Sequence, residues 1–215
     1  MKNIIAAGAV LLLAGGAQAL HAETNHDWAI SGYIGIADFE SEEKPDPYRP
    51  EVTHELTSDT AFKAGVIASK YYNDFSFNLG IESMQEVEVH DELDNKIGEH
   101  SHVPVFLGVN YHFDTNVIDP YIGAGFGYSF NDASESDFIT GQGMSMEVDD
   151  STFYFLTAGV EYPFSKSYTV FLAGKYTIGD IDVKGSSQTP QGTMQIEDEG
   201  TLDRYEVNLG LKYFF

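Results

Sequence analysis

The sequence predicts an all-β protein, an eight-stranded antiparallel up-and-down transmembrane β-barrel. Apolar residues recur at every second position in segments of about ten residues, which is the pattern of a barrel strand with two different faces. Long and short connectors alternate strictly between these segments, and aromatic residues gather beside the short connectors. After the N-terminus, no stretch approaches the ~18 consecutive apolar residues that mark a transmembrane helix.

Composition excludes several classes of protein. The 215 residues hold 34 Asp and Glu against 11 Lys and Arg, a net charge of −23, and no cysteine. This length suits one domain with a substantial core. The charge excludes an electrostatic nucleic-acid binder, because contacts to phosphate need clustered Lys and Arg. The lack of cysteine excludes a disulfide scaffold, a thiolate metal site and a cysteine nucleophile.

The N-terminus has the features of a secretory signal peptide. Lys2 provides a short positive start, Ile4–Ala14 is an apolar run, and Ala-Gln-Ala at 17–19 provides the small residues that a signal peptidase requires. A membrane anchor fits less well, because the run is short and no stop-transfer flank follows it.

We expect cleavage after Ala19, with Ala22 as a second position. Residues 1–19 are then the signal peptide, and residues 20–215 form an exported barrel with four long acidic extracellular loops. Loss of Lys2 leaves 34 acidic residues against 10 basic ones, a net charge of −24.

The first four candidate strands differ in how clearly they alternate. Their alternate apolar residues are Trp28, Ile30, Ile34 and Ile36; Phe62, Ala64 and Val66; Phe75, Phe77, Leu79 and Ile81; and Val103, Val105, Leu107, Val109 and Tyr111. The second is the weakest. The third is clear, because polar or small residues fill every position between its apolar ones.

The last four candidate strands complete an even number. Their alternate apolar residues are Ile122, Ala124, Phe126, Tyr128 and Phe130; Tyr154, Leu156, Ala158, Val160 and Tyr162; Val170, Leu172 and Tyr176; and Tyr205, Val207, Leu209, Leu211, Tyr213 and Phe215. The final segment is the cleanest of all. An even strand number leaves both chain ends on the same side of the membrane.

The connectors favour a membrane barrel over a soluble β-sandwich, which has the same period of two. The long connectors are roughly 40–60, 86–101, 131–150 and 179–202, and the short ones are 73–74, 114–118 and 163–168. A Greek-key sandwich has no reason to sort its loops in this way. An outer-membrane barrel has long extracellular loops and short periplasmic turns, and its sheet must close because lipid cannot satisfy backbone polar groups.

Charge and aromatic residues agree with that orientation. The long connectors contain 24 of the 34 acidic residues, so the charge belongs to an extracellular rim. The aromatic residues at the short-turn end resemble an interfacial girdle: they are Tyr71, Tyr72, Phe75, Tyr111, Phe113, Tyr121, Tyr162, Phe164, Tyr168, Tyr213 and Phe215.

If the apolar positions face lipid, the opposite positions line the lumen. The candidate lumen-lining residues are Lys63, Glu82, Phe106, His112, Gly123, Gly125, Gly127, Phe155, Lys175, Arg204 and Glu206. Their mixed charges predict compensating ion pairs, because an unpaired charge in a narrow interior is costly. Eight strands leave room for side chains or one small ligand and not for a wide pore. Two interpretations stay open: a closed plug, or a groove opened by the inward glycines.

Pro104 lies near the extracellular end of its strand and cannot donate a hydrogen bond to the ladder. It is the candidate for a lateral opening in the barrel wall, and a bulge without function is the other interpretation.

Catalytic and metal signals are weak. The connector that contains His90, His100 and His102 is rich in acidic residues, yet it has no ordered zinc or calcium spacing. Two histidines beside Ser101 without an oxyanion hole do not make a hydrolase site. We therefore expect no catalytic residue, no metal, no cofactor and no enzymatic activity.

Three stretches resemble the OmpW family of small outer-membrane barrels. The first is HVPVFLGVNYHF (102–113) followed by IDPYIGAGFGYSF (118–130), which is similar to the family's proline-containing strand, turn and P-Y-x-G-A-G strand. The second is residues 149–183, and the third is YEVNLGLKYFF (205–215), which ends in an aromatic residue as outer-membrane proteins commonly do.

The resemblance implies a function. It implies a monomeric barrel in the outer membrane of a Gram-negative bacterium that passes small, often hydrophobic, molecules and releases them sideways through its wall. It also implies that the barrel-assembly machinery recognises the C-terminal strand through Phe215, and that outer-membrane lipid and lipopolysaccharide surround the barrel. The other hypothesis is a surface barrel without transport whose acidic loops bind cations, lipopolysaccharide, or a host or phage partner.

Overall fold

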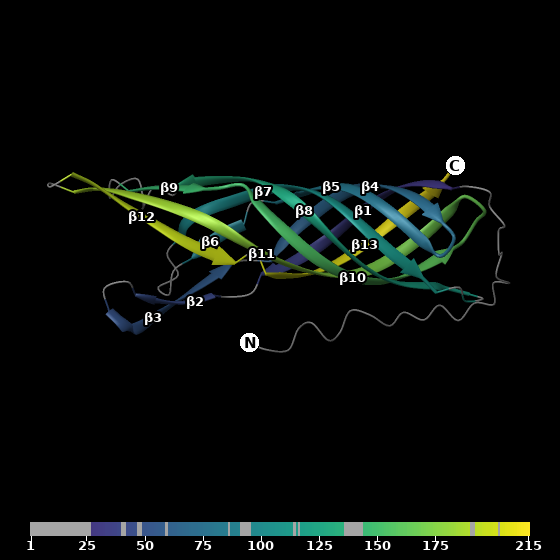
Figure 1. Cartoon of the computed structure of the whole chain (residues 1–215), viewed down its shortest axis with the longest axis horizontal. Coiled ribbons are helices and arrows are strands. Elements are labelled where there is room, and N and C mark those ends of the chain that lie inside the picture. Colours follow the sequence, from purple (N-terminus) through teal and green to yellow (C-terminus); the bar gives the residue numbers. More distant parts are fainter. Residues whose placement is uncertain are drawn as a thin grey trace.

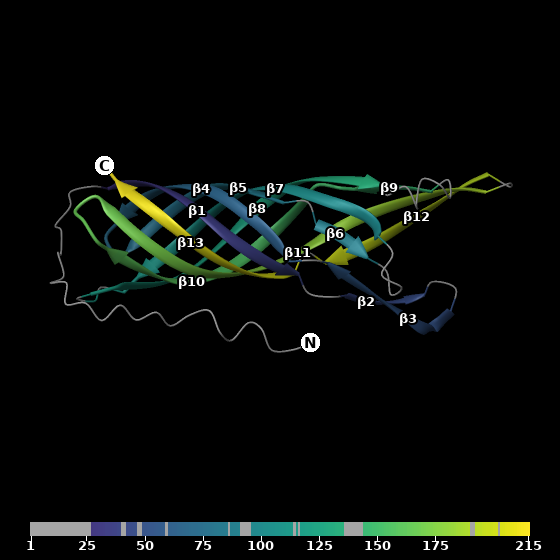
Figure 2. The ribbon, with the colours of Figure 1, turned by 180° about the vertical axis from the view of Figure 1, so that it is seen from behind.

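The computed structural model describes residues 27–39, 42–46, 49–58, 60–85, 87–90, 96–113, 115, 117–135, 144–189, 192–201 and 203–215. In this part of the chain, eight long antiparallel strands close into a barrel (Figures 1 and 2). They are β1 (Trp28–Phe39), β4 (Ala61–Tyr72), β5 (Phe75–Met84), β7 (Lys96–His112), β8 (Asp119–Glu135), β10 (Ser151–Pro163), β11 (Tyr168–Thr189) and β13 (Arg204–Phe214). The predicted fold class is confirmed.

The barrel has the simplest possible topology. Each barrel strand pairs with the barrel strands before and after it in the chain, and β1 pairs with β13 to close the sheet. The β1–β13 register runs without interruption from Ala29↔Phe214 to Phe39↔Arg204. Closure pairs the edge strands with each other, which satisfies the backbone groups that lipid would leave without partners.

The long connectors differ from the loops that the sequence predicts, because their described parts contain further strands. These are β2 (Glu42–Asp46), β3 (Arg49–Ser58), β6 (Val87–His90), β9 (Met144–Val148) and β12 (Gly192–Thr201). β12 alone forms ten register pairs with the upper part of β11. Apolar periodicity misses such strands because a hairpin above the membrane can form its backbone hydrogen bonds without an apolar face. Figure 1 shows this extension at the end opposite the C-terminus.

The short connector between β4 and β5 is a turn. β4 and β5 are joined through Asn73, whose φ of 51° is in the left-handed region that asparagine tolerates better than most residues. The Tyr72↔Phe75 pair closes this hairpin directly beside the turn. Both described chain ends, Asp27 and Phe215, lie at this same end of the barrel, as the even strand number predicts.

Each barrel strand has an apolar outer face and a buried inner face. β5 alternates strictly between exposed and buried residues, and outward side chains such as Ile34 and Phe62 are 66% and 67% exposed. In water these apolar surfaces would be unfavourable, whereas in a bilayer they meet hydrocarbon. Two aromatic residues of the expected girdle, Tyr71 and Tyr121, are instead inside the barrel, where both rings lie 5.4 Å from the His112 ring.

In the described ranges, no helix is long and apolar enough to cross a bilayer. The expected signal peptide, residues 1–19, lies outside the described residues.

Candidate functional site

Four strands of the barrel carry charged residues at inward positions of one level. Lys63 on β4, Glu82 on β5, Lys175 on β11, and Arg204 and Glu206 on β13 are all buried. All five were expected to line the lumen, and their side chains meet in one cluster, which we call the upper network.

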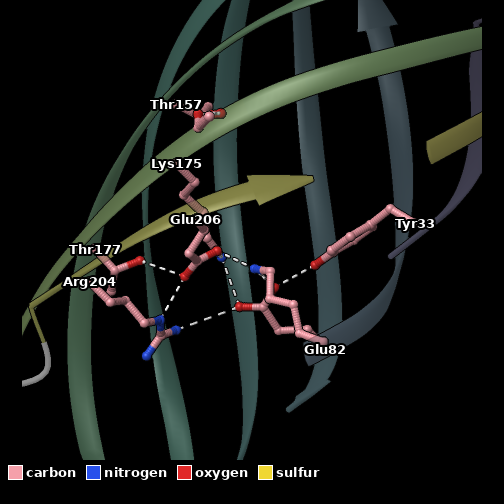
Figure 3. Close-up of polar contacts among 9 residues, drawn as sticks. Tyr33, Glu82, Thr157, Lys175, Thr177, Arg204 and Glu206 are labelled. Carbon is pink, nitrogen blue, oxygen red and sulfur yellow. Dashed lines mark hydrogen bonds and ion pairs between the residues drawn. The ribbon is translucent and has the colours of Figure 1, made fainter. Parts of the chain in front are cut away.

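Two carboxylates form the centre of the upper network (Figure 3). Glu82 receives hydrogen bonds from Lys63 Nζ at 2.8 Å and Lys175 Nζ at 2.7 Å. Glu206 accepts a hydrogen bond from Arg204 Nε at 2.6 Å, forms an ion pair with Lys175 at 2.9 Å, and also pairs with Lys63. The cluster therefore connects four strands across the barrel interior.

Two further residues complete the upper network, and the sequence analysis did not single them out. Tyr33 donates a hydrogen bond to Glu82 at 2.5 Å, and Thr177 donates one to Glu206 at 3.2 Å. Both lie at inward positions of their strands, so strand parity was the signal that could have identified them.

The upper network fills one level of the lumen with paired charges. Formally it combines three cations with two carboxylates. The Arg204 guanidinium also lies between two aromatic rings, with its Cζ 6.0 Å from the Phe39 centroid and 5.8 Å from the Phe153 centroid. Such ring contacts stabilise a desolvated cation.

A second polar layer, the lower network, lies nearer the short turns. Lys212 pairs with Glu161 and donates a hydrogen bond to the Tyr71 hydroxyl at 2.5 Å. His112, another predicted lumen residue, is close to this layer, and its Nε2 lies 2.9 Å from Ser76 Oγ.

A cavity of about 70 Å³ separates the two networks. Lys175 lines it from the upper network and Lys212 from the lower one. Ser31 Oγ and Asn208 Oδ1 also line it, and both atoms are buried without a hydrogen-bond partner in the described structure. A polar space of this size holds a few water molecules, which would satisfy these atoms.

The inward glycines do not form the groove that their sequence pattern suggested. A Cβ on Gly125 would lie 2.3 Å from Cζ of Phe155, and a Cβ on Gly127 would lie 2.3 Å from Cζ of Phe153. At Gly123 the same space holds the Asn110 side chain, at 2.0 Å. Each glycine thus accommodates a side chain from a neighbouring strand, as when aromatic rings cover glycines in designed sheets.

Phe106 follows the same pattern on the adjacent strand β7. It is paired in register with Gly80, and a Cβ on that glycine would lie 2.2 Å from Cζ of Phe106. The Phe106 and Phe155 rings meet edge to face at 5.4 Å between centroids. Predicted lumen residues therefore fill much of the middle of the described barrel.

Above the upper network the interior is apolar at β1, β4 and β5, whereas β8 and β10 carry the buried polar residues Ser129 and Ser151. Ala37, Ala61 and Met84 form a buried cluster with Phe39 packed against it. The Phe39 ring meets His102 edge to face at 6.1 Å. Ala61 and Met84 are the next inward residues above Lys63 and Glu82, so the upper network is the floor of this cluster.

The wall beside this apolar region has an interrupted ladder. β5 and β7 pair from Phe75↔Tyr111 up to Ile81↔Val105, and the next pair on that side of β7 is Val87↔His100. In the described segments between, 82–85 on one side and 101–104 on the other, no ladder pair joins the strands. On its other side β7 stays paired with β8 throughout, including Pro104↔Ser129.

Pro104 is at the lower edge of this interruption. It is almost fully buried and has no amide hydrogen to donate to a neighbouring strand. Glu82, the first residue of β5 above the last ladder pair, is a central carboxylate of the floor. The interrupted wall and the floor therefore meet at the same level of the barrel.

No metal site is found among the described residues, since they contain no cluster of three or more His, Asp or Glu side chains that could hold an ion. Of the histidines considered above, His102 is buried inside the barrel. The side chains of His90 and His100 lie outside the described part.

Comparison with known proteins identifies relatives of this barrel. The family of the outer membrane protein beta-barrel domain matches residues 7–215. The crystal structure of OprG from Pseudomonas aeruginosa superposes with a TM-score of 0.73 at 21% identity, covering 88% of this chain and 96% of that one. AlkL, determined in lipid bilayers, gives 0.61 at 16% identity and covers 100% and 97%. OmpW of E. coli gives 0.51 at 16% identity and covers 88% and 98%.

A comparison with curated protein sequences gives no match. The three structures agree with this chain in fold, and the family match extends over the whole barrel. The chain therefore belongs to the outer membrane β-barrel protein family.

Proposed function

We propose that this barrel lets small apolar molecules cross the outer membrane passively. A solute enters from the hairpin end, rests on the upper network, and leaves sideways between β5 and β7 at Pro104. The interrupted β5–β7 ladder directly above a closed charged floor is the observation that carries this proposal.

The interior favours a sideways route over an axial one. Ion pairs at the upper and lower networks fill the axis, and moving an apolar solute through them would separate buried charges at a cost of several kcal/mol. Above the floor, Ala37, Met84 and Phe39 form an apolar part of the wall. The chemistry of that space suits an uncharged solute of low polarity.

The wall also favours exit at this position. Elsewhere in a closed barrel, separating two strands breaks a row of backbone hydrogen bonds in a medium that cannot replace them. Between segments 82–85 and 101–104 the described structure has no such pairs to break. The resemblance of the Pro104 segment to the OmpW family, whose members are thought to release hydrophobic solutes sideways, points in the same direction.

The route lies within one chain, so we propose that the monomer is the functional unit. Export by a cleaved signal peptide to the outer membrane of a Gram-negative bacterium belongs to the same proposal. A surface barrel without transport, whose loops bind other partners, would show no solute flux.

A reversible cross-link tests the sideways route. The chain contains no cysteine, so Ser83→Cys with Val103→Cys places two thiols on outward positions of the two segments. In vesicles with a lipopolysaccharide outer leaflet, we expect the oxidised variant to lose accelerated naphthalene uptake and to regain it on reduction. The control is Val160→Cys with Leu172→Cys, a register pair of β10 and β11, whose oxidation should leave uptake unchanged. Continued uptake by the cross-linked Ser83/Val103 variant would contradict sideways exit.

A further inference from the structure

The outer wall of the barrel carries an apolar groove of about 470 Å³. It crosses β4, β5, β7 and β8 on the face that meets lipid, and the backbone of Asn78 and Gly108 separates it from the interior cavity. Its floor is the backbone of Asn78, Gly108 and Gly125, which are consecutive partners in the registers of β5, β7 and β8. These residues direct their side chains inward or have none, so only backbone separates the two walls of the groove.

Two rows of outward side chains form the walls. The lower row contains Lys70, Phe77, Val109 and Ala124, which are successive register partners, and the upper row contains Ala68, Leu79, Leu107 and Phe126, related in the same way. Each row contains one alanine, Ala124 in the lower row and Ala68 in the upper row, whose side chain is smaller than those of its neighbours. The groove runs between the two rows and parallel to them.

The groove rises from the periplasmic interface into the membrane. At its lower end Lys70 is two residues from the end of β4, and its register partner Trp28 is the first residue of β1. At the other end Ala124 is five residues beyond the start of β8. Since strands advance about 3.3 Å per residue, the groove ascends obliquely, as a lipid chain would from a head group at the interface.

The lower end presents both charges at the interface. Lys70 Nζ lies 2.8 Å from Asp27 Oδ2 and 5.0 Å from the centroid of the Trp28 ring. The Asp27 side chain is 68% exposed and that of Lys70 36% exposed. A tryptophan and a lysine at this level are typical anchors at the boundary of a bilayer.

We propose that this groove binds one zwitterionic phospholipid of the periplasmic leaflet. The phosphate pairs with Lys70, the head-group ammonium pairs with Asp27, and one acyl chain lies between the two rows of side chains. The adjacent positive and negative groups of Lys70 and Asp27 are opposite in sign to the adjacent phosphate and ammonium of phosphatidylethanolamine, so both pairs can form together. Its ammonium also donates hydrogen bonds, which the trimethylammonium of phosphatidylcholine does not.

Native mass spectrometry of the full barrel, freed of lipid in detergent and titrated with single lipids, tests this site. We expect one phosphatidylethanolamine to bind about fivefold more tightly than phosphatidylcholine, because a hydrogen bond to a charged group is gained. Asp27→Asn should remove that preference, and Lys70→Met should weaken both lipids.

Filling the groove separates a specific site from general lipid contact. Ala68→Leu with Ala124→Leu should lower phosphatidylethanolamine affinity about tenfold or more, since the acyl chain loses its place. The matched control, Ala64→Leu with Ala158→Leu, changes two outward alanines that do not line the groove. Equal affinity of the filled and control variants, no preference for phosphatidylethanolamine, or tighter binding of lipid A would each overturn the proposal. Naphthalene uptake should be unchanged in the filled variant, so this proposal and the transport route fail separately.

Discussion

Lys175 and Glu82 come from opposite walls of the barrel, yet Lys175 Nζ lies 2.7 Å from Glu82 Oε1. Their strands, β11 and β5, are separated by three strands in one direction around the sheet, β4, β1 and β13. The pair therefore spans the lumen and connects walls that share no backbone hydrogen bond. A narrow barrel can be closed by side chains alone in this way.

We expect Glu82→Ala to destabilise the folded barrel by about 3–5 kcal/mol, because three buried cations would then share one carboxylate. Urea unfolding in detergent, followed by fluorescence of the single tryptophan, Trp28, measures this change. The comparison is Asp27→Asn, which removes an exposed pair and should cost less than about 1 kcal/mol. Equal stability of the two variants would show that the ion pairs of Glu82 do not stabilise the folded barrel as expected.

Gly80→Ala should destabilise the barrel by about 1–3 kcal/mol, because the new methyl group must displace the Phe106 ring that now occupies its place. In the double variant with Phe106→Ala the clash disappears, so the two changes should be non-additive by about 0.5–3 kcal/mol. A double-mutant cycle from the same urea unfolding curves measures the coupling. Simple additivity would mean that ring and glycine do not interact.

Ala19→Arg should block removal of residues 1–19, because a signal peptidase accepts only small residues at that position. Mass spectrometry of protein from cell envelopes would then find a product 19 residues longer than the wild-type protein. Wild-type protein that retains Met1 would contradict the expected signal peptide, and a mature start after Ala22 would only move the cleavage position.

Phe215→Ser should reduce the amount of barrel assembled in the outer membrane without unfolding purified protein. The Phe215 side chain is 58% exposed, so it contributes little to packing, although its backbone amide donates a hydrogen bond to Trp28 O at 3.0 Å. Heat-modifiable gel mobility measures the folded fraction in envelopes and after refolding in detergent. If both fractions fell together, Phe215 would be a stability residue and not an assembly signal.

Strand parity predicted which residues face the interior and that their charges would pair. It did not predict which residue pairs with which. Lys63, Arg204 and Glu206 are inward because they alternate with apolar neighbours. Which of them meet depends on the relative heights of strands around a tilted barrel, and that depends on every register in the sheet. Gly125 illustrates the difference: its inward direction is readable in the sequence, whereas the ring that covers it comes from Phe155, its register partner on β10.

The hairpin extensions could not be predicted by the same means. In the membrane, apolar and polar positions must alternate, so β5 can be predicted from its sequence. β12 pairs with β11 from Asp180↔Thr201 to Thr189↔Gly192, in a segment dominated by polar and acidic residues, where both faces can meet water. The pairing there depends on backbone hydrogen bonds and on β11, which continues upward from the barrel.

The upper network has three cations and two carboxylates, so its formal charge is positive, whereas the net charge of the whole chain is −23. The long connectors of the sequence are rich in acidic residues, yet the upper network holds Lys63, Lys175 and Arg204 against two carboxylates. A metal cation that reaches the floor meets net repulsion in a medium where charges interact strongly. In the proposed transport route, this floor would therefore repel metal cations while neutral solutes use the adjoining wall.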